Sequence, residues 1–383
     1  MEKLNIFDFQ INQVGYITEC VEPISGHLTL KDTIQYFESN PDIGAIPVEL
    51  GQGYGVISRS DVLQKRGPLS NTGKPLSSLD SMNQQFSSFN SHENIKKVLR
   101  DSSEYKGQQF FIIYKESSLF GVVSLNNIIR HISDIQDEEI RKGREFQQFL
   151  LDRNLIKDSD FELISHLQRS HDLGKDYYYC SSISNDISMI SCFDVQGGNQ
   201  TASLVSVMID AFFKTRKELT SLDLGDVEKL MLSLNSFLFH HTPEDFQVRS
   251  LFVFIHKIEK KVKIYNFGYT TPFLILLEEG KIKAKMPAPP FEAMGMKDLV
   301  IFRETPQVFE MKNLRHIFLY SEGLASCVNS FGESFGMDRI KEALVNNYKS
   351  LGSDFSSILE EKVNHFRKDT PLLDDITTLI VNF

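Results

Sequence analysis

The sequence contains no tryptophan and only four cysteines among its 383 residues, and no two cysteines form a Cys-x-x-Cys pair. A disulfide framework and a zinc site built on such pairs are therefore excluded, and reduced thiols in a cytoplasmic protein are expected. No run approaches the roughly 18 uninterrupted apolar residues of a membrane helix, and the N-terminal residues lack the apolar core of a signal peptide. We therefore expect a soluble protein with no membrane partner.

Positive charge is also in short supply, because 41 Lys and Arg stand against 51 Asp and Glu, a formal net charge of −10. A phosphate backbone would be repelled by that field on average, so nucleic acid is not expected as the main partner. Hydrophobic residues make up 41% and charged residues 24%, which is typical of globular proteins. The length predicts two or three domains.

Two N-terminal segments, at about residues 24–63 and 89–132, resemble each other. Each contains a helical stretch, an apolar strand, a turn, a second strand and a further helix, and Gly55-Val-Ile-Ser in the first corresponds to Gly121-Val-Val-Ser in the second. Internal repeats of this kind usually stack and share a core. We predict a domain over residues 1–132 with a repeated β-α-β-β-α pattern.

The chain then changes character twice. Residues 133–155 are highly charged and predict a linker helix, whose interrupted heptad seam fits either a homodimer contact or a solvated helix. Residues 156–383 contain many short strand-like runs, interrupted by helices expected at about 201–217, 226–240, 338–348 and 355–366. We predict an α+β chain whose C-terminal domain is an α-β-β-α sandwich of two antiparallel sheets flanked by helices.

Four acidic residues lie at the ends of predicted strands in the C-terminal domain: Asp176, Asp194, Glu322 and Asp374. Crowded carboxylates repel one another unless a cation lies between them. An oxygen-only set of this kind suits Mg²⁺ or Mn²⁺. Acids are common on every soluble surface, so their spacing alone does not decide between a metal site and ordinary surface charge.

Six strings occur in order in this region, namely GKDYYY, FDVQGGNQTASLVSVM, NFGYTTPFLIL, FLYSEG, FGMDRIKEAL and DDITTLIV. Over about residues 145–383 the series resembles the metal-dependent protein Ser/Thr phosphatases of the PPM (PP2C-like) family, in the bacterial branch typified by sporulation stage II E. The resemblance implies a two-metal-activated water, with Mn²⁺ or Mg²⁺ held by Asp176, Asp194, the Val195 carbonyl, Glu322 and Asp374. Asp194 would bridge the ions, and Asp194, Asp176 and Asp374 would be the catalytic residues.

The same resemblance implies a phosphoprotein substrate, of which an anti-sigma-factor antagonist is the example suggested by the bacterial branch. Several positions depart from the family pattern: Glu322 replaces an Asp, Tyr179 replaces a second Asp, Lys175 replaces a Gly, and Tyr269 replaces a His. Two hypotheses follow, an active phosphatase and a catalytically inactive nucleotide-sensing scaffold of the same fold.

The N-terminal string AIPVELGQGYGVISRSDVLQ resembles the CBS-domain pair, the regulatory module of cystathionine β-synthase type. That resemblance implies an adenine nucleotide bound by Ser58 and Asp61, regulation of the phosphatase, and a homodimer through the pair and the linker helix. The second repeat has Ser124 but carries Asn127 where the acid would stand, so one nucleotide site is favoured over two. A ligand-free dimerisation module is the alternative.

Overall fold

The chain folds into two compact units, residues Met1–Glu139 and Ile140–Phe383. The computed structural model describes residues 9–51, 53–64, 73–78, 86–105, 107–152, 158–171, 173–219, 227–244, 246–287, 292–297 and 306–383. Most of the loop expected at 66–85, the last residues of the predicted linker and residue 226 lie outside the described residues. No helix in the described ranges is both long enough and apolar enough to cross a membrane.

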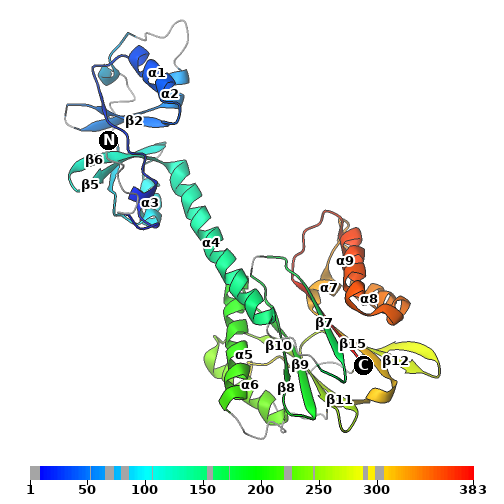
Figure 1. The fold of residues 1–383 in the computed structure, drawn as a ribbon. Helices are drawn as coiled ribbons and strands as arrows, with labels where there is room; N and C mark the ends of the chain where they lie inside the picture. The colour runs from blue at the N-terminus through cyan, green and yellow to red at the C-terminus, as the bar shows by residue number, and fades with distance from the viewer. Residues whose placement is uncertain are drawn as a thin grey trace. The chain divides into compact units, whose positions relative to one another are not determined.

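The N-terminal unit contains the same order of elements twice (Figure 1). The first copy comprises β1 (Ile24–Ser25), α1 (Leu30–Ser39), β2 (Ala45–Glu49), β3 (Tyr54–Ser58) and α2 (Arg59–Gln64). The second comprises β4 (Ser88–Asn90), α3 (Ile95–Ser102), β5 (Phe110–Lys115), β6 (Ser118–Ser124) and the first part of α4 (Leu125–Asp152). Each copy forms a three-stranded sheet, β1-β2-β3 or β4-β5-β6.

The two repeats share a small core. Ala45 and Val56 from the first sheet form a buried cluster with Ile112 and Val122 from the second. Burying these apolar side chains stabilises the pairing of the repeats. The two predicted helices at the end of this region, one closing the second repeat and one forming the linker, are a single helix, α4, which runs across the boundary between the units.

The C-terminal unit is built on two five-stranded antiparallel sheets. The first has the order β14-β11-β10-β9-β8 and the second the order β13-β12-β15-β16-β7. Their bounds are β7 (Glu162–Gln168), β8 (Asp176–Ser182), β9 (Ile187–Val195), β10 (Val248–His256), β11 (Lys261–Phe267), β12 (Phe273–Glu278), β13 (Lys281–Lys285), β14 (Gln307–Glu310), β15 (Leu314–Tyr320) and β16 (Ile376–Asn382).

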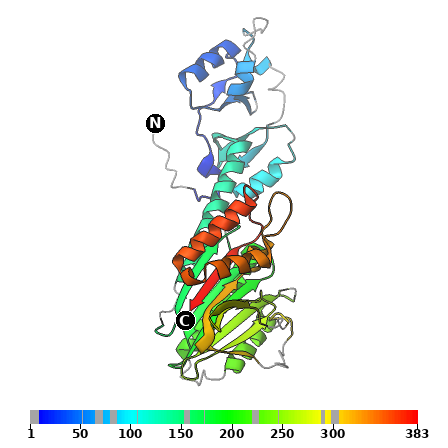
Figure 2. The ribbon, with the colours of Figure 1, turned by 90° about the vertical axis from the view of Figure 1, so that its right-hand side faces the viewer.

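Helices cover the outer face of each sheet (Figures 1 and 2). Helices α5 (Asn199–Leu219) and α6 (Val227–His241) pack on the first sheet through one large core cluster that also joins the two sheets. Helices α8 (Gly336–Asn346) and α9 (Ser353–Arg367) pack on the second sheet through another. A short helix, α7 (Glu322–Ser326), follows β15. The chain is thus a mixed α+β protein, as its sequence predicts.

Candidate active site

Three neighbouring strands of the first sheet place two carboxylates and a guanidinium in one row. Asp176 at the start of β8 lies directly opposite Asp194 on β9, and Arg249 on β10 lies opposite Asp194 on its other side. Directly opposite residues of antiparallel strands present their side chains on the same face of the sheet. The register therefore brings Asp176, Asp194 and Arg249 together, although they are far apart in the sequence.

The two carboxylates of this row are buried, with Asp176 5% and Asp194 4% exposed. Oδ2 of Asp176 has no hydrogen-bond partner, whereas Oδ1 of Asp194 accepts from the Gln196 side chain. Burial and the nearby charge of Asp194 raise the pKa of Asp176 well above its ordinary value, and the neighbouring Thr377 and Ser321 hydroxyls offset this only in part. Burial also raises the pKa of Asp194, an effect that Arg249 offsets only in part. A buried carboxylate oxygen without a donor is left available to a cation.

The second sheet contributes Glu322 and Asp374. Glu322 begins α7 directly after β15, and Asp374 precedes β16, the strand paired with β15. Ser321 joins the two segments, because its hydroxyl donates to the Asp375 carbonyl and accepts from the Thr377 amide, both at 2.9 Å.

Gly323 allows α7 to approach this segment closely. A Cβ atom at Gly323 would lie 2.0 Å from the carbonyl oxygen of Asp375, closer than any non-bonded pair tolerates. The sequence LYSEG therefore needs its glycine because backbone meets backbone at this point.

Asp375 fixes the loop that leads into β8. Its carboxylate accepts from the Ser170 amide at 2.9 Å, from the Ser170 hydroxyl at 3.0 Å and from the Lys175 amide at 2.8 Å. On the other side of the loop, the buried Gln147 side chain of α4 bonds both the amide and the carbonyl of Gly174. Asp176 therefore follows a loop held from two directions.

Two basic side chains lie among the acids. Arg249 donates through one terminal nitrogen to Asp194 and through the other to Glu322, and so links the two sheets. The Lys175 ammonium lies 3.0 Å from Oδ1 of Asp374. Burial lowers the pKa of Arg249, but the charges of Asp194 and Glu322 outweigh it and leave that pKa raised. Three of the four predicted ligand carboxylates thus already have a cationic partner.

The donor chemistry suits Mg²⁺ or Mn²⁺, since every candidate ligand is an oxygen and Asp176 presents an orphaned one. The arrangement is less favourable. Within the described part of the chain, no three Asp, Glu, His or Cys side chains come close enough together to hold one ion. The ligand atoms are of the type that binds Mg²⁺ or Mn²⁺. A complete ligand shell would require Arg249 and Lys175 to move away from the acids.

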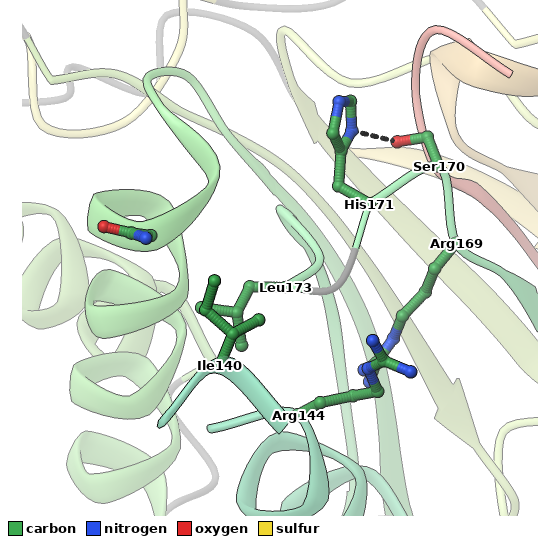
Figure 3. Close-up of a pocket in the computed structure, with 7 residues that line it drawn as sticks. Ile140, Arg144, Arg169, Ser170, His171 and Leu173 are labelled. Atoms are coloured by element: carbon green, nitrogen blue, oxygen red, sulfur yellow. Dashed lines mark hydrogen bonds between the residues drawn. The ribbon is translucent and has the colours of Figure 1, made fainter. Parts of the chain in front are cut away.

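A cavity of about 600 Å³ borders the loop that precedes Asp176 (Figure 3). Arg144 from α4 and Arg169, just after β7, both line it, and Figure 3 shows their side chains approaching each other. Burial lowers the pKa of Arg169, and Arg144 adds to that effect. Ser170 on its rim donates to the carboxylate of Asp375, so the cavity and the acidic site share a wall.

One family model matches most of the C-terminal unit. The model of the family described as stage II sporulation protein E (SpoIIE) matches residues 186–383, more than half of the chain. The chain belongs to the SpoIIE family. The matched region begins at the turn before β9 and contains Asp194, Glu322 and Asp374, whereas Asp176 lies just upstream of it.

Solved structures show the fold of this SpoIIE-family domain. The PP2C domain of SiaA from Pseudomonas aeruginosa is 16% identical, with 66% of this chain and 98% of that one covered and a TM-score of 0.51. The PP2C phosphatase domain of SpoIIE from Bacillus subtilis, solved with a fragment of its regulatory domain, is 15% identical, with 58% and 63% covered and a TM-score of 0.42. No curated protein sequence matches the chain. The likeness to the SiaA domain shows that the C-terminal unit has a PP2C-like fold.

The predicted phosphatase residues of this SpoIIE-family chain gather around the facing ends of the two sheets. Val195 ends β9 beside Asp194 and is fully buried. Ser58 and Asp61 lie in the other unit. Sequence reasoning missed Arg249 and Asp375 as parts of the site. Two signals in the sequence could have found them. Arg249 is a charge near the start of the mostly apolar strand VRSLFVFIH, and Asp375 is the second acid of LLDDITTLIV.

Ser58 and Asp61 bond mainly to each other. The Ser58 hydroxyl donates to Asp61 Oδ2 at 2.6 Å, the Asp61 amide donates to the Ser58 hydroxyl at 3.1 Å, and the Ser58 amide donates to Asp61 Oδ2 at 3.3 Å. Since Ser58 immediately precedes α2, the pair forms a capping box at its N-terminus. This local role accounts for both residues without a ligand.

Proposed function

We propose that the chain is a metal-dependent phosphatase that hydrolyses phosphoserine or phosphothreonine on a protein. The observation that carries the proposal is the buried Asp176, whose Oδ2 lacks a partner, directly opposite Asp194. Two facing buried carboxylates are costly, and a divalent cation is a partner that would compensate them. Membership of the SpoIIE family supports the same conclusion.

In this proposal Asp176, Asp194 and the Val195 carbonyl would hold one ion, and Asp194, Glu322 and Asp374 are the side chains that a second ion would use. Bound metal would lower the pKa of a coordinated water and orient a phosphoryl group for in-line attack. The chain's own contribution is to fix the ligands. The register of β8 and β9 sets one pair, and the Ser321 bonds and the close approach at Gly323 set the other.

The substrate and control are further parts of the proposal. An anti-sigma-factor antagonist is the phosphoprotein suggested by the bacterial branch of the family, and the cytoplasm, where four free cysteines stay reduced, is the compartment. We assign the N-terminal repeats to a CBS pair that binds an adenine nucleotide and forms a homodimer. Helix α4 provides a route for regulation, because Gln147 holds Gly174 two residues before Asp176.

A second candidate is a scaffold that keeps the fold but has lost turnover. It is favoured by Arg249 and Lys175, which pair with Asp194, Glu322 and Asp374 and so neutralise them without a metal. Such a protein would still bind its phosphoprotein partner. It would not release phosphate.

Hydrolysis of p-nitrophenyl phosphate and of a phosphoserine peptide, measured with Mn²⁺, with Mg²⁺ and with a chelator, separates the candidates. We expect metal-dependent turnover that Asp194→Asn reduces to background. Asp369→Asn is the matched control, since it removes the same charge from an exposed turn and should leave the rate unchanged. Absence of phosphate release from the native chain with either metal would favour the scaffold.

A further inference from the structure

Arg249 is the one Lys, Arg, Asp or Glu of β10. Every other residue of this strand is buried. Its guanidinium binds a carboxylate from each sheet, Asp194 on one side and Glu322 on the other. Its Nε is buried and has no hydrogen-bond partner. A charged side chain is rarely placed in such surroundings without a compensating charge, so the two acids explain its position.

Two basic side chains offset half of the negative charge of the site without any metal. Asp176, Asp194, Glu322 and Asp374 carry four negative charges, and Arg249 and Lys175 supply two positive ones. Arginine stays protonated at every pH at which the protein is folded, so Arg249 does not lose this charge by titration. A divalent ion that uses both Asp194 and Glu322 must therefore displace the guanidinium or share the space with it.

We propose that the guanidinium of Arg249 is a resident cation that takes the place of one of the two metal ions, the one that would lie between Asp194 and Glu322. The inference rests on the proposed phosphatase site. It implies that the native chain binds a single divalent ion, on the side where Asp176 Oδ2 is unpartnered. The second position becomes available only when Arg249 is removed.

Equilibrium dialysis and calorimetry with Mn²⁺ on the full chain test this directly, without reference to turnover. Arg249→Met keeps an unbranched side chain of similar length and removes the charge. We expect about one ion per native chain and about two per Arg249→Met chain, the number a two-metal site holds. Arg315→Met is the matched control, since Arg315 is an exposed arginine on β15, and it should bind as the native chain does.

Thermal unfolding provides a second readout. Without metal, Arg249→Met should unfold at a lower temperature than the native chain, because it leaves the buried Asp194 carboxylate unpaired. Added Mn²⁺ should raise its unfolding temperature by more than it raises that of the native chain. If Arg249→Met does not fold, Arg249→Lys retains a cation and should still bind about one ion.

A native chain that already binds about two ions, as two-metal sites do, overturns the inference. An Arg249→Met chain that gains no ion also overturns it. Failure of the proposed function would give a different result. The native and variant chains would bind the expected numbers of ions, but neither would release phosphate from any substrate.

Discussion

The two units of the molecule satisfy the polar groups at their strand ends in different ways. At the end of β3 in the N-terminal unit, Ser58 and Asp61 satisfy each other within four residues of chain. At the start of β8 in the C-terminal unit, Asp176 and Asp194 face each other with like charges, and one carboxylate oxygen is left without a donor. The first arrangement is complete as it stands, whereas the second requires a cation.

This difference shows which polar residues call for a functional explanation. A capping box is worth roughly 1 kcal/mol to the helix that it begins, so Ser58 and Asp61 have a structural role whether or not a nucleotide binds. A pair of buried, facing carboxylates has no such structural benefit, because burial disfavours their charged forms.

Asp176→Asn should separate stability from function most clearly. The substitution removes a buried charge, so the metal-free protein should become more stable at neutral pH, while Mn²⁺ affinity and turnover fall to near background. Because the folded-state pKa of Asp176 lies above its ordinary value of 3.8, just above that pH the folded state retains a proton that the unfolded state has already lost. The native chain should therefore lose stability with rising pH from about 4 until the raised pKa is passed.

Urea unfolding of both chains across this pH range, with a chelator present, measures the effect. Asp176→Asn should show a flatter dependence of the unfolding free energy on pH than the native chain. Asp369→Asn, on the surface, should follow the native curve. A metal-free Asp176→Asn chain that is less stable than the native chain at neutral pH would show that the carboxylate has a structural role.

The fold was more predictable than the site. Apolar runs such as FFIIYK and RSLFVFIHKI predict their strands because alternation and β-branched or aromatic content are local properties. The opposition of Arg249 to Asp194 is a property of register, which depends on pairing between strands 55 residues apart in the sequence. The role of the Asp375 carboxylate likewise depends on a loop about 200 residues away.

The family resemblance predicted the candidate metal ligands more completely than the spacing of acidic residues could. It located Asp176, Asp194, Glu322 and Asp374, which the structure brings to the facing ends of two sheets. It did not predict the two basic side chains among these acids. Arg249 lies outside the six motifs, and Lys175 stands where the family pattern has a glycine.

Gly323→Ala and Gly121→Ala form a matched pair, one in each unit. An added Cβ would lie 2.0 Å from the Asp375 carbonyl oxygen at Gly323 and 2.1 Å from the Glu19 carbonyl oxygen at Gly121. Overpacking of this kind costs about 1–3 kcal/mol. We expect both variants to be destabilised, but only Gly323→Ala to lose turnover, because it displaces the helix that carries Glu322.

Hydrogen exchange should show the loss of protection in the altered unit, and phosphate release should report on the site. Equal loss of turnover in both variants would mean that the N-terminal unit controls the phosphatase even without a ligand. Retention of full turnover by Gly323→Ala would remove Glu322 from the site.

Ser58→Ala and Ser124→Ala compare the two repeats at equivalent positions, and their effects should be the smallest. Ser58 exchanges bonds with Asp61 in both directions, whereas Ser124 accepts a single bond from the Asn127 amide at 3.0 Å. Loss of a helix cap costs about 1 kcal/mol, so Ser58→Ala should cost about that amount and Ser124→Ala less. Thermal unfolding with and without an adenine nucleotide measures both the cap and the proposed ligand. Nucleotide should stabilise the native chain and Ser124→Ala but not Asp61→Ala, and equal stabilisation of all three chains would place the nucleotide elsewhere.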